Sequence, residues 1–168
     1  KASEIAPCSL FELAKLIDQA GFPKGVVSVV TGDSDNCAIP LTSHPGIDRI
    51  AFTGGTETAK KIIKNSSNNF AATNLELGGK SPLIIFDDAD IESAANGIIA
   101  GNFGASGQSC VAGSRVIAQK NISSKLKDII KQKSENIIVG NPLDLKTNLG
   151  PLCTSKQIEI IENTINKS

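Results

Sequence analysis

Strand-like and helix-like segments alternate along this chain, and the alternation is the feature that most restricts its fold. Short β-branched or apolar runs are separated by segments with helical spacing, and turns containing glycine or proline lie between them. Strands are predicted at 26–30, 49–53, 70–76, 83–86 and 116–118, and helices at 9–20, 36–42, 56–64, from 91, around 126–130 and from 155. Strands that alternate with helices favour right-handed crossovers, which predicts an α/β fold with a mostly parallel sheet covered on both faces.

Two helix starts carry capping signals. Ser9-Leu10-Phe11-Glu12 fits a capping box for the first helix, and Asp90 fits an N-cap for the helix that begins at 91. Gly140-Asn141-Pro142 and Gly150-Pro151 predict an irregular connection before the last helix.

Composition excludes several classes of function. Seventeen basic and seventeen acidic residues balance without a basic run, so we expect no nucleic-acid partner and no anionic membrane partner. Apolar runs such as Leu83-Ile84-Ile85-Phe86 are too short to span a bilayer. Four cysteines without a C-x-x-C pair and a single histidine fit neither a zinc site nor a disulfide scaffold, so we expect free thiols, no metal and a cytoplasmic location. The chain begins at lysine and contains no methionine, so we also expect an internal segment of a longer protein.

Cys110 is the best candidate for a reactive thiol. Glycines at 101, 104, 107 and 113 leave room for a ligand to approach the backbone around it. Backbone N–H groups of the Ser109–Ala112 turn would stabilise both a thiolate and an oxyanion formed on attack. The alternative is a small apolar side chain that fills a gap, as for the other three cysteines.

Glu76 ends an apolar strand and is followed by Gly78-Gly79. A carboxylate in such apolar surroundings is paired, bound by N–H groups of the turn, or held with a raised pKa for proton transfer, and the residues alone leave these three open. Gly54-Gly55 separates a strand from a helix and leaves N–H groups free for a pyrophosphate, although the chain contains no G-x-G-x-x-G motif. Lys1 and Glu4 taken alone are solvated charges.

Together these segments resemble the aldehyde dehydrogenase superfamily over nearly the whole chain. The matching segments, in family order, are Lys1-Ala2-Ser3-Glu4, Ala20-Gly21-Phe22-Pro23-Lys24-Gly25-Val26-Val27, Phe52-Thr53-Gly54-Gly55-Thr56, Leu75-Glu76-Leu77-Gly78-Gly79-Lys80-Ser81-Pro82, Gly107-Gln108-Ser109-Cys110 through Arg115, and Gly140-Asn141-Pro142. The resemblance implies a partial Rossmann-like parallel sheet in residues 1–78, as the C-terminal part of an NAD-binding domain. It implies that residues 79–168 form the first part of a second α/β domain, the catalytic one.

The resemblance also implies a reaction and its residues. Cys110 corresponds to the nucleophile that forms a thiohemiacetal and then a thioester, and Glu76 to the general base that activates water, so that an aldehyde becomes a carboxylic acid with NAD(P)+ as oxidant. Contacts to the cofactor are implied at Lys1, Glu4, Thr53, Gly54, Gly55, Leu77 and Gly78. Glu4 would repel a 2′-phosphate, which favours NAD+ over NADP+.

The chain departs from the family pattern in several places. Many relatives carry serine at the position of Gly55, so only the backbone could contact pyrophosphate there. The family's asparagine oxyanion donor lies upstream of this chain, and a second carboxylate and the oligomerisation strand lie downstream. We therefore expect the chain to be inactive alone, and the whole protein to be a homodimer or homotetramer that acts on a small aldehyde.

Two alternatives stay open at this point. A CoA-acylating relative would pass the thioester to coenzyme A, and Glu76 argues against it because a water-activating base would waste the acyl group. A non-catalytic chain with the same fold would need neither Cys110 nor Glu76.

Overall fold

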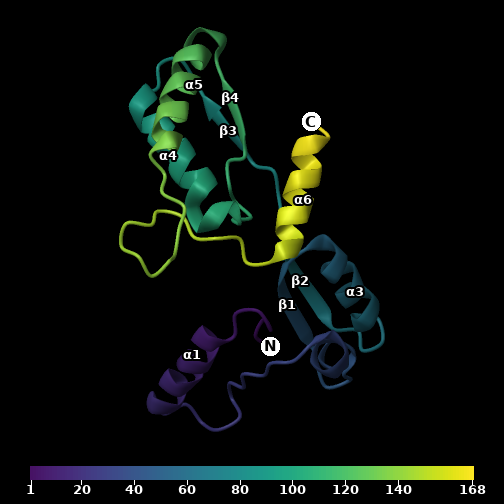
Figure 1. Ribbon diagram of the computed structural model, residues 1–168. Coiled ribbons are helices and arrows are strands. Elements are labelled where there is room, and N and C mark those ends of the chain that lie inside the picture. Colours follow the sequence, from purple (N-terminus) through teal and green to yellow (C-terminus); the bar gives the residue numbers. More distant parts are fainter. The chain divides into compact units, whose positions relative to one another are not determined.

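The computed structural model describes residues 1–168, which form two compact units, Lys1–Leu77 and Gly78–Ser168. Each unit contains a two-stranded parallel sheet together with helices (Figure 1). The α/β class and the parallel pairing predicted from the sequence are therefore confirmed. The assignment of 1–78 to an NAD-binding domain and of 79–168 to a catalytic domain stays a prediction. None of the helices has both the length and the apolar character needed to cross a membrane.

The first unit is built around one β-α-β connection. Its elements are α1 (Cys8–Gln19), the π-helical turn η1 (Ser34–Ala38), α2 (Ile39–Ser43), β1 (Arg49–Gly54), α3 (Thr56–Ser66) and β2 (Ala72–Leu77). Ala59, Ile62 and Ser66 are buried on one face of α3, because residues three and four apart lie on the same side of a helix. The helix connects β1 to β2, which lie side by side in Figure 1. The predicted strands at 49–53 and 70–76 and the helix at 56–64 are confirmed.

Two local predictions in this unit are wrong. The first helix begins at Cys8, its N-cap is Pro7 without a side-chain hydrogen bond, and Ser9 already lies inside the helix. The expected capping box therefore does not form, and the Glu12 carboxylate accepts a hydrogen bond from Lys15 Nζ at 2.7 Å instead. Residues 26–30 form no strand, because a strand needs a neighbour to pair with. Apart from the local turn bond from Val26 N–H to Pro23 O, only Ala2 N–H bonds to this segment, at Val30 O. The weak helix expected near 36–42 is confirmed, as the two consecutive helical segments η1 and α2.

The second unit packs two helices against a short sheet. Its elements are β3 (Pro82–Ile85), α4 (Ile91–Phe103), a short 3-10 turn η2 (Gly104–Gly107), β4 (Arg115–Ala118), α5 (Lys120–Glu135) and α6 (Ser155–Asn166). The core joins Ile85, Ala95, Ile98 and Leu126, so α4 and α5 lie on the same side of the sheet (Figure 1). Asp90 is the N-cap of α4 as predicted: its Oδ1 accepts from Ser93 N at 2.7 Å, and hydrogen bonds from the side chain and backbone of Ser93 lower the pKa of the Asp90 carboxyl.

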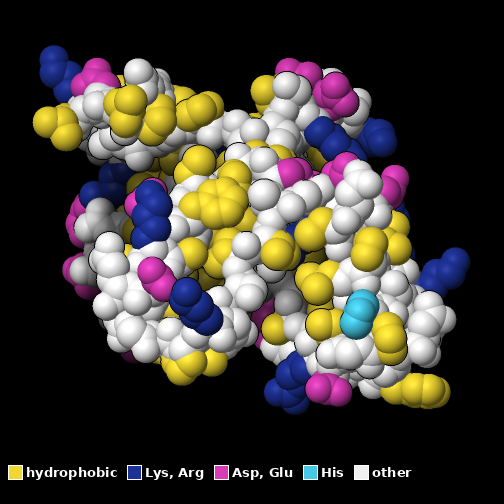
Figure 2. All heavy atoms as spheres, turned by 90° about the horizontal axis from the view of Figure 1, so that it is seen from below, with side chains coloured by type: hydrophobic (Ala, Val, Ile, Leu, Met, Phe, Trp, Pro, Cys, Tyr) yellow, Lys and Arg dark blue, Asp and Glu magenta, His cyan; other side chains and the backbone are white.

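The other face of this sheet is open, which differs from the expected cover on both faces. Parallel pairing places Ile84 opposite Ile117 with both side chains on that face, where they are 58% and 50% exposed. Hydrophobic side chains are visible elsewhere on the surface as well (Figure 2). The difference has a simple physical basis. α4 and α5 pack against the same face of β3 and β4, and the core cluster contains no further helix that could cover the opposite face.

Candidate functional site

Cys110 lies on an exposed turn between α4 and β4. The turn is preceded by three consecutive residues in the left-handed region, Ala105 (φ 51°), Ser106 (φ 54°) and Gly107 (φ 73°). Only the glycine adopts this conformation without steric cost, and each of the other two costs on the order of 1–3 kcal/mol of backbone strain. A strained run of this kind persists only when neighbouring contacts hold it, so the path of the chain toward Cys110 is imposed by its surroundings.

Three side chains outside the turn hold it in place. Asn102 Nδ2 donates to Ile98 O at 2.9 Å and to Gly113 O at 3.1 Å. Ser106 Oγ donates to Gly150 O at 3.0 Å, and Arg115 Nε donates to Lys80 O at 2.8 Å. The sequence alone pointed to none of these three as contacts of the Cys110 turn, because each bonds to a backbone carbonyl whose position depends on the fold.

The backbone amides of the turn differ in what they bind. Val111 N–H donates to Ser109 Oγ at 3.4 Å, and Ala112 N–H donates to Ser109 O at 3.2 Å. The N–H groups of Ser109 and Cys110 make no hydrogen bond within the chain. These two amides are therefore free to donate to a ligand beside the Cys110 thiol.

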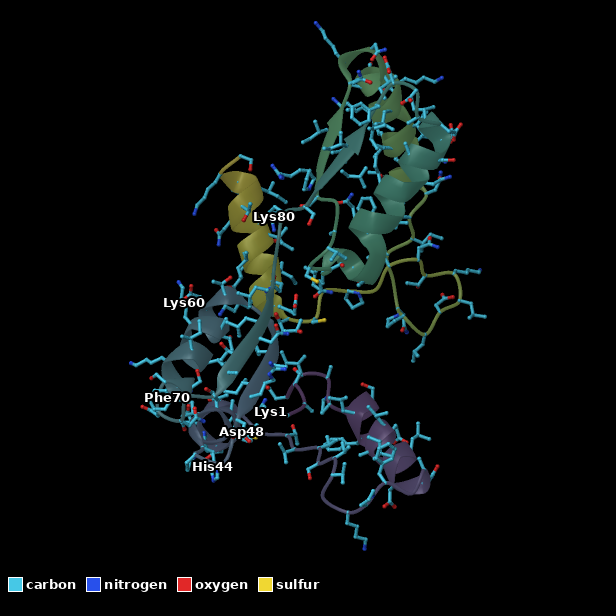
Figure 3. All side chains as sticks on the ribbon, turned by 180° about the vertical axis from the view of Figure 1, so that it is seen from behind. Lys1, His44, Asp48, Lys60, Phe70 and Lys80 are labelled. Atoms are coloured by element: carbon cyan, nitrogen blue, oxygen red, sulfur yellow. The ribbon has the colours of Figure 1, made fainter.

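Gly79 lies against this turn. A Cβ at position 79 would be 3.2 Å from Cys110 O, closer than most real Cβ contacts, so the glycine permits this approach. Lys80 follows on the segment that leads into β3 (Figure 3), and Arg115 bonds to its carbonyl. The predicted Gly78-Gly79 and Cys110 motifs thus meet through Gly79, within the second unit.

The carboxyl ends of β1 and β2 bring a second group of candidates together. The parallel register pairs Thr53 with Glu76 and Gly54 with Leu77. Gly55 follows as the N-cap of α3, and no heavy atom lies within 4 Å of the place where its Cβ would be. The edge formed by the carboxyl ends of parallel strands is where α/β sheets bind ligands.

Glu76 is exposed, which corrects the expectation that it sits in apolar surroundings. Its neighbours Leu75 and Leu77 are half-buried, but side chains alternate faces along a strand, so the carboxylate of Glu76 points away from the side that they cover. No hydrogen bond or ion pair in the structure involves this carboxylate. Pairing with another group of the chain, which is one of the three possibilities raised by the sequence, is therefore not observed.

Lys1 and Glu4 form an ion pair. Lys1 Nζ lies 3.0 Å from Glu4 Oε2 and also donates to Ala2 O at 3.0 Å. Ala2 is buried and its N–H donates to Val30 O at 2.8 Å, which fixes the start of the segment. A hydrogen bond from its own backbone amide and the ion pair with Lys1 lower the pKa of Glu4. No hydrogen bond connects this pair to the Gly54-Gly55 turn.

The remaining polar groups do not form a further catalytic cluster. Cys8 and Cys153 are exposed like Cys110, so exposure alone does not distinguish Cys110, whereas the strained turn and the free amides do. His44 accepts a hydrogen bond from Gly46 N at 3.0 Å through Nδ1, which is a structural role. No three side chains of histidine, cysteine, aspartate or glutamate gather in a metal-binding arrangement.

Comparison with known proteins finds similar sequences along the whole chain. The sequence model of the Aldehyde dehydrogenase family matches residues 1–168. A curated relative, (Z)-2-((N-methylformamido)methylene)-5-hydroxybutyrolactone dehydrogenase of Acinetobacter baylyi, is 52% identical over 168 residues, which are 100% of this chain and 34% of the relative. Betaine aldehyde dehydrogenase of Agrobacterium fabrum is 40% identical over 167 residues, which are 99% of this chain and 34% of the relative.

Solved structures agree with the sequence relatives. The crystal structure of betaine aldehyde dehydrogenase from Staphylococcus aureus in complex with NAD+ is 37% identical with a TM-score of 0.91, and the match covers 98% of this chain and 32% of that one. The chain thus spans about a third of the length of the curated relatives that it matches. The family model covers every residue of the sequence, and the chain therefore belongs to the aldehyde dehydrogenase family.

Proposed function

We propose that the whole protein oxidises an aldehyde to a carboxylic acid with NAD+, and that Cys110 and Glu76 carry its two chemical steps. The Cys110 turn is the observation that supports this most directly: an exposed thiol, a strained approach and two free amides occur together there. Family membership supports the reaction class. The roles of Cys110 and Glu76 are those that the resemblance of their motifs implies.

In the proposed first step the Cys110 thiolate attacks the aldehyde carbon, and the carbonyl oxygen becomes the oxyanion of a thiohemiacetal. The N–H groups of Ser109 and Cys110 are available to donate to that oxygen because neither is used within the chain. NAD+ bound by the protein would supply the oxidising power by accepting the hydride from the same carbon. A thioester on Cys110 remains.

In the proposed second step Glu76 removes a proton from water, the water oxygen attacks the thioester carbon, and Cys110 leaves as a thiolate. The Glu76 carboxylate suits this task because it is exposed and bonded to no other group of the chain. A carboxylate held by an ion pair would be a weaker base.

The edge at the ends of β1 and β2 fits a dinucleotide. The first N–H groups of α3 have no side-chain cap, and the space beside Gly55 is open, so the backbone could bind a pyrophosphate. Glu57 adds a negative charge in the first turn of α3, but it is paired with Lys60 at 2.8 Å. Lys1, Glu4, Thr53, Leu77 and Gly78 stay proposed cofactor contacts.

The proposed reaction is tested on the whole protein with NAD+ and a panel of aldehydes that includes betaine aldehyde, the compound named in several relatives. We expect NADH and free carboxylic acid in equal amounts, with no dependence on coenzyme A. Acyl-CoA as the product would favour the CoA-acylating alternative instead. No turnover across the panel, despite a folded protein that binds NAD+, would favour the non-catalytic alternative. A homodimer or homotetramer is proposed as the active form.

NAD+ is expected to be preferred over NADP+ because Glu4 keeps a negative charge where the adenosine ribose is proposed to bind. A hydrogen bond from its own backbone amide and the pair with Lys1 lower the pKa of Glu4, which favours the ionised carboxylate. Replacing Glu4 with glutamine removes the repulsion and is expected to reduce the NAD+ preference by about tenfold or more. The ratio of the two kcat/KM values measures this preference, and Glu12→Gln is the control because Glu12 also pairs with a lysine three residues away. A wild-type protein that prefers NADP+ would reject the prediction.

A further inference from the structure

One hydrogen-bonded side chain closes the base of the Cys110 turn. Asn102 is the next-to-last residue of α4, and its single amide nitrogen donates to Ile98 O, one helical turn earlier, and to Gly113 O, beyond Cys110. The amide therefore joins the end of the helix to the far side of the turn, at 2.9 Å and 3.1 Å. Residues 103–112, including the nucleophile, lie between the two joined points.

The far end of this connection is closely packed. Gly113 is buried, and a Cβ there would be 2.9 Å from Leu83 Cδ1 and 3.1 Å from Leu83 Cβ. Arg115 N–H then donates to Ser81 O at 3.2 Å, where pairing with β3 begins. No other donor in the chain reaches Gly113 O, so removal of the Asn102 amide would leave a carbonyl of a buried residue without a partner.

The other two side chains that hold this region act differently. Ser106 Oγ bonds to Gly150 O, which belongs to the irregular segment before α6. Arg115 Nε bonds to Lys80 O and lies outside the turn. Of the three side-chain hydrogen bonds, the one from Asn102 to Gly113 O encloses Cys110 in the shortest stretch of chain.

We propose that Asn102 is a positioning residue for Cys110. By fixing the spacing between α4 and Gly113, the amide holds the thiol and the free N–H groups of Ser109 and Cys110 in one arrangement. Without it the ten intervening residues regain conformational freedom, and the attacking sulfur and the oxyanion donors are no longer held together. This role depends on the proposed function of Cys110 as nucleophile.

The test compares Asn102→Ala and Asn102→Asp with Asn96→Ala in the whole protein. Asn96 lies in the same helix, is exposed and makes no hydrogen bond through its side chain. Both Asn102 variants are expected to lower kcat, and to slow the labelling of Cys110 by iodoacetamide, by about tenfold to a hundredfold. The dissociation constant of NAD+ and the KM for aldehyde are expected to change little, and Asn96→Ala should match wild type.

The aspartate variant adds a readout that loss of stability would not reproduce. A carboxylate cannot donate to Gly113 O, but a protonated carboxyl can. The ratio of the Asn102→Asp labelling rate to the wild-type rate, taken at each pH, is therefore expected to rise as the pH falls. A ratio that stays constant would count against a role through this hydrogen bond.

The outcomes separate the two proposals. Folded Asn102 variants that bind NAD+ and keep wild-type kcat and labelling would overturn the positioning role, whatever the effect of replacing Cys110. If neither variant folds, as judged by near-ultraviolet circular dichroism, Asn102 serves stability and the proposal is again overturned. If Cys110→Ala keeps full activity, the proposed function itself is rejected.

Discussion

Replacing Cys110 with alanine is expected to abolish aldehyde oxidation by the whole protein, with kcat reduced by a factor on the order of 10⁴ or more. The proposed route begins with a bond between sulfur and the carbonyl carbon, and alanine has no atom that can form it. The measurement is the initial rate of NADH formation at saturating aldehyde. NAD+ binding, measured by calorimetry, is expected to be retained because the substitution leaves the backbone of the turn unchanged.

Cys153→Ala is the matched control, because Cys153 is also an exposed thiol of the second unit. Its rate is expected to equal that of wild type. A Cys110→Ala protein as active as wild type would show that the reaction does not pass through this sulfur. Equal losses in both variants would indicate a general effect of thiol removal.

Replacing Glu76 with glutamine is expected to stop the reaction after the first oxidation. The thiohemiacetal can still form and lose its hydride, so a rapid burst of NADH equal to the active-site concentration should appear. Hydrolysis then lacks its base, and the steady rate is expected to fall by about 10²–10⁴-fold. Stopped-flow absorbance measures the burst, and mass spectrometry of the quenched protein should find the acyl group on Cys110.

Glu12→Gln provides the control for this substitution, since Glu12 is an exposed glutamate on α1 whose only bond is to Lys15. It should turn over at the wild-type rate without a burst. A Glu76→Gln protein that shows neither a burst nor a slower steady rate would remove Glu76 from the mechanism.

The fold was predictable wherever a segment carried its own periodic pattern. α3, α4 and α5 follow from apolar residues at helical spacing, and the paired strands follow from short β-branched runs between turns. Residues 26–30 have the same β-branched composition but form no strand, because pairing depends on a neighbour that a local pattern does not reveal. The Ser9 capping box does not form because Pro7 is the N-cap, two residues before the position that the motif requires.

The candidate site was predictable in part. Cys110, Glu76 and the Gly54-Gly55 turn are visible as motifs because their chemistry demands particular residue types next to glycine. Asn102 and Ser106 are not visible in this way, since an asparagine at a helix end and a serine in a loop are common. Their partners, Gly113 and Gly150, are likewise unremarkable in sequence or lie far along the chain. The exposure of Glu76 does not follow from its flanking leucines, because a strand turns alternate side chains to opposite faces.

The paired register of β1 and β2 limits how this sequence can change in length. A slip by one residue would set Thr53 beside Leu75 or Leu77 and turn the Glu76 carboxylate to the other face of the sheet. An extra residue inside β2 would force such a slip or a bulge. In the segment from 139 to 149 the only strand-like pairing is one isolated bridge, Val139 with Leu149, and the leucines at 143 and 145 are exposed. Insertions and deletions among homologous genes should therefore accumulate in the segment 139–149 and be selected against within β1 and β2.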